Sequence, residues 1–149
     1  MHELERANDK GDAQYVQKFE DVLARIAAEA DPDSIESLLA FFEEKPLYDE
    51  PMFSIVHTIE AFDDNTYVDR MVVGMPSLSA RSPRWASILQ MRIMNSEPTY
   101  AAYLGRLANA TPEECSAAAR VASAVAAKQP RFGSRVQMLL DVCGAEPRR

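Results

Sequence analysis

The sequence predicts an all-α protein, and three observations support this prediction. Apolar residues recur at intervals of three and four, the spacing that places them on one face of a helix, as at Phe19, Val22, Leu23 and Ile26. Five glycines in 149 residues are few for a β protein with many tight turns. Alternation of apolar and polar residues with a period of two is not sustained anywhere in the sequence.

The first half of the chain contains starts of four helices. A first helix is expected from Asp12, and the tripeptide Asp31-Pro32-Asp33 should stop it and start a second, because proline is tolerated in a first turn and aspartate caps free N–H groups. The second helix is expected to run to Lys45-Pro46. Asp49-Glu50-Pro51 repeats the start signal for a third helix, and the corner Asp63-Asp64-Asn65-Thr66, rich in capping residues, precedes a fourth.

The second half continues the pattern. Gly74 and Pro76 are expected to loosen or end the fourth helix. Further starts lie at Ser82-Pro83, at Ser96-Glu97-Pro98 and at Thr111-Pro112-Glu113-Glu114, which matches a capping box. Gln129-Pro130 should break the helix that begins there. A last helix should follow, closed by Gly144.

These starts predict about eight short helices in antiparallel pairs. The proline-marked starts, near residues 32, 51, 83, 98, 112 and 130, suggest that helical pairs recur roughly every 30 to 40 residues, as in a HEAT-like α-solenoid. Because sequence similarity between the pairs is weak, an irregular helical bundle is the alternative. We expect one domain over residues 1–149, with a frayed segment at residues 1–11.

The charge is distributed unevenly along the chain. Residues 1–64 carry 17 acidic and 5 basic side chains, whereas residues 65–149 carry 6 acidic and 11 basic ones. The acidic half would repel a phosphate backbone and attract a basic protein surface, so we expect no direct contact with nucleic acid. A solvated acidic face that only aids solubility is the simpler interpretation of the charge alone.

The sequence contains no recognisable catalytic or metal site, and we expect neither an enzyme nor a cofactor. His57 and Glu60 have a spacing that could serve a metal or an acid–base pair, but a second such motif is lacking, so a structural hydrogen bond is the favoured role. Asp63 and Asp64 could bind a cation or a basic partner, although helix capping is more common for such a pair. Arg92 lies among apolar residues and should need an acidic partner, either Glu60 or Glu97.

The cysteines and the N-terminal residues indicate the cellular compartment of the protein. Cys115 and Cys143 lie far apart in the sequence without a Cys-x-x-Cys motif, so we expect small buried thiols of a reducing compartment. The first residues show no apolar signal-peptide core, and no apolar run reaches membrane-spanning length. A cytoplasmic protein without a membrane partner is the expectation.

Two stretches carry a resemblance to a known family. Residues 52–68 read Met-Phe-Ser-Ile-Val-His-Thr-Ile-Glu-Ala-Phe-Asp-Asp-Asn-Thr-Tyr-Val, and residues 85–97 read Trp-Ala-Ser-Ile-Leu-Gln-Met-Arg-Ile-Met-Asn-Ser-Glu. Together they resemble immunity protein family 30 of bacterial polymorphic-toxin and contact-dependent growth inhibition systems. The resemblance covers roughly residues 35–110.

The resemblance implies a non-enzymatic protein that binds the C-terminal domain of a cognate toxin, blocking its active site or its access to substrate. From the acidic charge we expect a basic toxin, such as a nuclease. The alternatives are a helical-repeat adaptor with another client and an enzyme with a site around His57. The residues expected to contact the toxin are Glu43, Glu44, Asp49, Glu50, Glu60, Asp63, Asp64 and Tyr67. Those expected to hold the helices together are His57, Trp85, Arg92, Asn95 and Glu97.

Overall fold

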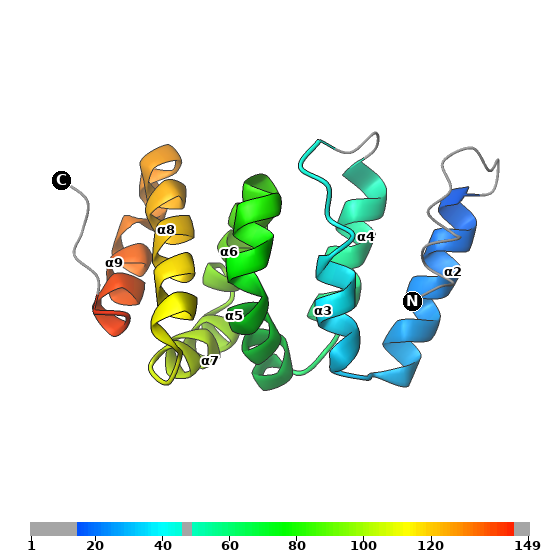
Figure 1. The fold of residues 1–149 in the computed structure, drawn as a ribbon, viewed down its shortest axis with the longest axis horizontal. Coiled ribbons are helices and arrows are strands. Elements are labelled where there is room, and N and C mark those ends of the chain that lie inside the picture. The colour runs from blue at the N-terminus through cyan, green and yellow to red at the C-terminus, as the bar shows by residue number, and fades with distance from the viewer. Residues whose placement is uncertain (1–14, 46–48, 145–149) are drawn as a thin grey trace.

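The computed structural model describes residues 15–45 and 49–144, and this part of the chain is helical without a strand (Figure 1). The predicted all-α class is confirmed. The frayed segment at residues 1–11 and the helix start at Asp12 lie outside the described residues. The α-helices are α2 (Tyr15–Glu29), α3 (Asp33–Leu39), α4 (Asp49–Glu60), α5 (Asp64–Arg81), α6 (Pro83–Met94), α7 (Glu97–Leu107), α8 (Pro112–Lys128) and α9 (Gly133–Val142), with a 3₁₀ turn at Pro130–Phe132.

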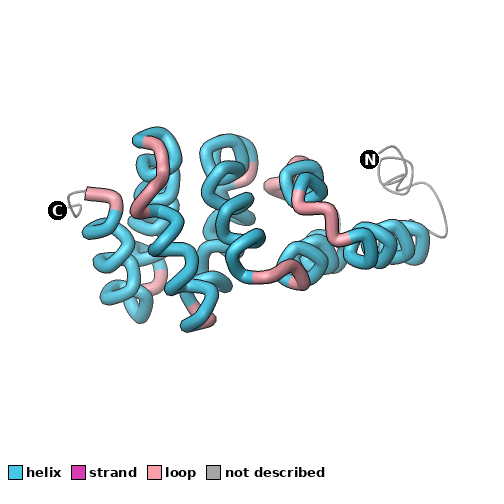
Figure 2. Tube along the Cα trace, turned by 90° about the horizontal axis from the view of Figure 1, so that it is seen from below, coloured by secondary structure: helices cyan, strands magenta, loops and turns pink. Residues whose placement is uncertain are grey.

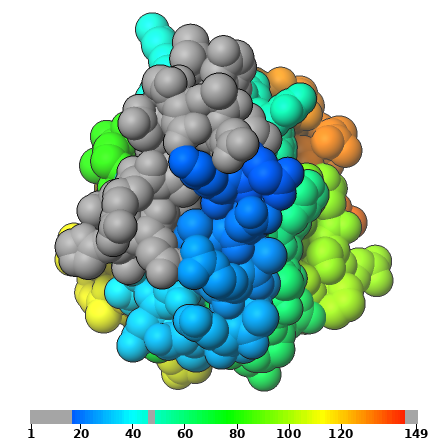
Figure 3. Space-filling model, turned by 90° about the vertical axis from the view of Figure 1, so that its right-hand side faces the viewer, coloured from blue at the N-terminus to red at the C-terminus, as the bar shows by residue number. Residues whose placement is uncertain are grey.

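Helices two positions apart in the chain pack on each other. α2 packs on α4 and α6 on α8, while α3 packs on α5, α5 on α7, and α7 on α9. Figure 2 shows the resulting elongated array of helices, and Figure 3 shows α2 (blue) beside α4 at one end of it. This is the relation that a stack of helical pairs requires. α5 also packs on α8, which departs from a regular repeat, and the solenoid stays a prediction.

Side-chain hydrogen bonds follow the same rule. Two of them, from Arg81 to Leu39 and from Gln90 to Ala118, join helices two positions apart with partners 42 and 28 residues apart in the sequence. In seven further residue pairs that join a helix to the helix two positions on, the partners lie 32 to 37 residues apart. The separation matches the predicted recurrence of helical pairs. The pairs are Glu20 with Ser54, Glu36 with Arg70, Asp49 with Arg84, Glu60 with Arg92, Asp64 with Thr99, Asp69 with Arg106, and Tyr100 with Arg135.

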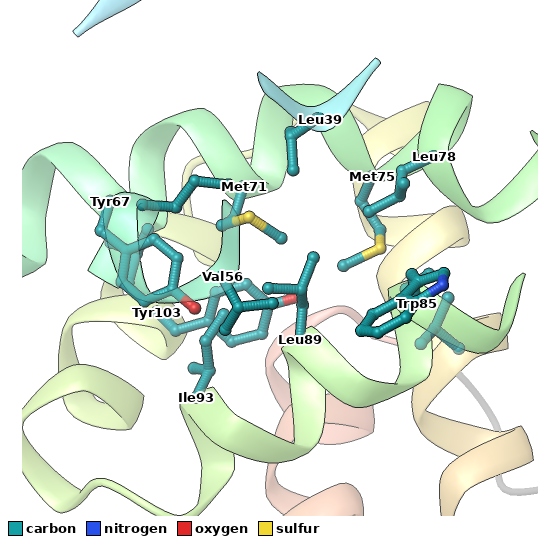
Figure 4. Close-up of a cluster of buried hydrophobic side chains, with 14 of the residues drawn as sticks. Leu39, Val56, Tyr67, Met71, Met75, Leu78, Trp85, Leu89, Ile93 and Tyr103 are labelled. Carbon is teal, nitrogen blue, oxygen red and sulfur yellow. The ribbon is translucent and has the colours of Figure 1, made fainter. Parts of the chain in front are cut away.

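Trp85 is fully buried in the core and lies near Met75 (Figure 4). Its ring stacks on Phe42 at 5.3 Å between centroids and meets Phe53 edge-on at 5.2 Å. Phe42 comes from the segment after α3. The prediction that the second helix runs to Lys45 is therefore wrong, because α3 ends at Leu39. The chain turns there, and the turn places the Phe42 ring in the core.

A second correction concerns α5, which continues through Gly74 and Pro76 to Arg81. The missing N–H of Pro76 removes one helical hydrogen bond, but Met75 and Leu78 are buried on either side of it, and this packing holds the helix together. Gly74 permits a close approach rather than a break. A Cβ atom added there would lie 2.6 Å from Cδ1 of Leu39 on α3.

Local start signals are confirmed at two later helices. Thr111 and Glu114 form the predicted capping box, with Pro112 at the first helical position. α6 begins at Pro83. Its Ser82 hydroxyl is buried and donates to the carbonyl of Phe42 at 2.9 Å, so this residue connects the start of α6 to the turn after α3.

Candidate partner-binding surface

The predicted contact residues lie in two groups at opposite ends of α4. Glu43, Glu44, Asp49 and Glu50, here the first acidic group, lie before or within its first turn. Glu60, Asp63 and Asp64, the second acidic group, lie at its last residue and beyond. A helix of 12 residues is about 16 Å long from its first residue to its last, so the fold does not bring the eight predicted residues into one site.

The first acidic group is organised by Arg84, which sequence reasoning missed. A carboxylate oxygen of Glu44 accepts the backbone N–H of Arg84 at 2.9 Å, in the first turn of α6. Both guanidinium NH groups of Arg84 donate to Asp49, at 3.0 and 3.4 Å. The hydrogen bond to Asp49 raises the pKa of Arg84, and its guanidinium lies 4.8 Å from the centre of the Trp85 ring.

The remaining acids of the first group differ in their surroundings. Glu43 is half-buried, whereas Glu50 is exposed. The carboxylate of Glu50 has no ion-pair or hydrogen-bond partner among the described residues. Glu50 is therefore available to a partner, while Glu44 and Asp49 are held in place by α6.

The second acidic group is engaged within the fold. Glu60 accepts two hydrogen bonds from the guanidinium of Arg92, at 2.7 and 2.8 Å, so the predicted pairing of Arg92 with an acid is confirmed. These bonds raise the pKa of Arg92. His57 Nδ1 lies 3.6 Å from Glu60, but 67% of the His57 side chain is exposed. His57 therefore lies on the surface rather than inside the helical packing.

Asp63 and Asp64 both have structural partners. Asp63 accepts the backbone N–H of Thr66 at 3.0 Å and its hydroxyl at 2.8 Å, so it caps α5 as predicted. The bond from the Thr66 hydroxyl is the main reason that the pKa of Asp63 is lowered. Asp64 accepts from the Thr99 hydroxyl at 2.8 Å and links α5 to α7.

Tyr67 does not fit the predicted contact role. It is only 3% exposed and lies in the core beside Met71, close to Tyr103 (Figure 4). Burial, and then the nearby charge of Glu60, raise the pKa of its hydroxyl. That hydroxyl has no hydrogen-bond partner among the described residues. A toxin could not touch Tyr67 without displacing its neighbours.

The other predicted motif residues divide between core and surface. Trp85 is buried as a structural residue should be. Asn95 and Glu97 are exposed, at the end of α6 and the start of α7 respectively. One sequence signal could have pointed to Arg84: a basic residue in the first turn of a helix opposes the helix dipole, so it calls for an acidic partner nearby.

A groove of about 510 Å³ lies between α6 and α8. Its floor is apolar, formed by Ile88 and Met91 from α6 and by Ala124 and Val125 from α8. Glu44 and Arg84 line the groove beside the start of α6, and Lys128 and Gln129 line it at the end of α8. The groove therefore adjoins the first acidic group.

The two cysteines are half-buried free thiols. The fold brings them close enough for Cys115 to contribute to the raised pKa of the Cys143 thiol. Burial raises the pKa of Cys143 to about 12, which disfavours the nucleophilic thiolate. Across residues 15–45 and 49–144, no three His, Cys, Asp or Glu side chains are placed to hold a metal ion together. None of the described helices combines the length and apolarity needed to cross a bilayer.

Comparison with protein families gives a match to Immunity protein 30 over residues 10–103. The chain belongs to this family. The matched region contains α2 to α6 and most of α7, so it begins well before the resemblance noted in the sequence. Both acidic groups and the Glu60–Arg92 pair lie inside it. No curated protein and no solved structure matches the chain.

Proposed function

We propose that this immunity protein binds a cognate bacterial toxin domain and neutralises it by covering its active site or its substrate-binding surface. The match to Immunity protein 30 over residues 10–103 carries the proposal. Inhibition would come from binding alone, without a reaction catalysed by the immunity protein. The chain would act as a single domain in the cytoplasm, where an incoming toxin meets its target.

The charge of the chain supports a basic toxin, such as a nuclease, in a contact-dependent inhibition or polymorphic-toxin system. Residues 1–64 hold 17 of the 23 acidic side chains. Opposite charges on two proteins accelerate their encounter and disfavour wrong partners, and the effect weakens as salt screens the charges. An acidic inhibitor would also occupy a surface that a nuclease otherwise offers to phosphate groups.

The first acidic group supports contact better than the second. Glu44 and Asp49 bond to Arg84 in the first turn of α6, which holds them in position without burying them fully. Preorganised charges lose little conformational freedom when a partner binds. In the second group, Glu60, Asp63 and Asp64 each serve an internal hydrogen bond. We therefore propose Glu50 and its neighbours Glu44 and Asp49 as the centre of the toxin contact.

Co-expression with the toxin-like domain encoded beside this chain tests the proposal. Survival of the cells together with a one-to-one complex on co-purification would support it. Cell death without a complex would overturn it and favour the adaptor alternative. Within a working pair, Glu50→Lys should slow association at low salt, because it reverses a charge that has no described internal partner. Glu113→Lys, which reverses an exposed acid at the start of α8, is the matched control.

A further inference from the structure

We infer, on the basis of the proposed function, that the toxin inserts a large apolar side chain into the groove between α6 and α8. The groove has a volume of about 510 Å³, and its floor is apolar. Ile88 and Met91 on this floor are half-buried, so part of each side chain meets water in the free protein. Apolar side chains gain free energy when a partner removes them from water.

The groove has room for a side chain because α8 contributes little bulk to it. Ala124 is exposed and lines the groove, and its side chain ends at Cβ. Val125, the next lining residue, is buried in the core. Pockets that bind small molecules have volumes of roughly 300 to 1,000 Å³, so the groove is large enough for an aromatic or branched aliphatic side chain.

The groove is continuous with the first acidic group. Glu44 belongs to this group and lines the groove, and its carboxylate accepts the backbone N–H of Arg84. Arg84 also lines the groove, and its guanidinium donates to Asp49, the neighbour of Glu50. The start of α4, the start of α6 and the end of α8 lie at the same edge of the molecule, the upper edge in Figure 1. A toxin bound to Asp49 and Glu50 therefore lies beside the groove.

The groove supplies what the first acidic group lacks as an interface. A specific interface covers about 800 Å² of each partner and combines a polar rim with an apolar core. Most of its binding energy comes from a few large side chains that fill pockets near its centre. Acidic side chains can form the rim, and the groove is an apolar hollow directly beside them. A toxin that covered the groove without filling it would lose the contacts that its floor can make.

The charges in the lining favour an uncharged occupant. Arg84 and Lys128 line the groove together with one acid, Glu44. A lysine or arginine of the toxin would meet two like charges there and one opposite charge. The basic residues of the toxin are therefore better placed at the exposed Glu50, outside the groove, and an uncharged apolar side chain fits inside it.

The test measures binding of the purified toxin domain to variants of the full chain. Ala124→Trp fills the groove from α8 and should weaken the complex at least about tenfold through faster dissociation, because it displaces the inserted side chain. Ala127→Trp is the matched control: Ala127 is exposed on the same helix and does not line the groove, so this variant should bind like the wild type. Met91→Gln, which makes the floor more polar, should also speed dissociation.

Association and dissociation rates separate this inference from the proposed function. Glu50→Lys should slow association, whereas filling the groove should leave the association rate nearly unchanged. If Glu50→Lys slows association but Ala124→Trp binds as tightly as Ala127→Trp, the groove inference is wrong and the proposed function stands. If the wild-type chain binds no toxin, both fail. If Ala124→Trp abolishes a dimer of the free protein and leaves toxin binding intact, the occupant is a second copy and the inference fails.

Discussion

Gly74 provides a sharp test of the packing between α3 and α5. In an isolated helix, replacing glycine with alanine stabilises the helix by about 1 kcal/mol. Here the new Cβ would lie 2.6 Å from Cδ1 of Leu39, well inside van der Waals contact, and Leu39 is itself buried. Overpacking of a core typically costs about 1 to 3 kcal/mol, so Gly74→Ala should destabilise the protein by a net amount of up to about 2 kcal/mol.

The same substitution should change sign when the obstructing atom is absent. Leu39→Ala removes Cδ1 and should by itself lower the free energy of unfolding by about 2 to 5 kcal/mol. In that background Gly74→Ala should stabilise the protein by about 1 kcal/mol, because only the helix propensity is left. Urea unfolding followed by circular dichroism of the four proteins gives the coupling free energy.

Two outcomes would refute this reasoning. If Gly74→Ala stabilises the wild-type protein by the full helix-propensity term, α3 and α5 do not approach closely at this point. If Gly74→Ala changes the unfolding free energy equally in the wild-type protein and in the Leu39→Ala background, the two residues are not coupled, and Gly74 has another role.

Two further predictions concern the core and the thiols. Phe42→Ala should lower the free energy of unfolding by about 3 to 5 kcal/mol, because its ring stacks on Trp85. Phe62→Ala, at a half-buried position, should lower it by less, and equal losses in the two variants would contradict the importance of the Phe42 contact. Cys143 should react slowly with iodoacetamide at neutral pH and faster as the pH approaches its pKa of about 12, because only the thiolate reacts. Fast alkylation of the folded protein at pH 7 would contradict the raised pKa. Because the pKa of Cys143 is higher in the folded than in the unfolded chain, the folded state keeps this proton to a higher pH, and the free energy of unfolding should fall as the pH rises from about 9 to 12.

The candidate surface was predictable only in part. Arg92 was expected to need an acid because it lies among apolar residues, and Glu60 meets that need. The role of Arg84 was not predicted in this way, because Arg84 is exposed in the first turn of α6, and only the fold brings Glu44 and Asp49 to it. Tyr67 was expected to contact the toxin on the surface, but it is buried. Helical periodicity shows on which face of its helix a residue lies, but it does not show which faces other helices cover.

The sequence by itself determined the helical class and several helix starts. Caps and prolines act within one turn, so Thr111, Pro112 and Glu114 specify the start of α8 without the rest of the fold. Asp63 specifies the start of α5 in the same way. Several hydrogen bonds between helices join residues 34 or 35 apart, a separation within the 30 to 40 residues predicted for the recurrence of helical pairs.

Tertiary structure decided where helices end and which residues meet. α3 stops at Leu39, and the turn that follows it places the ring of Phe42 against Trp85, which lies far from it in the sequence. α5 passes through Pro76 because its neighbours bury residues on both sides of it. These outcomes depend on the free energy of burial, which exists only once distant segments have come together, and no local signal in the chain records it.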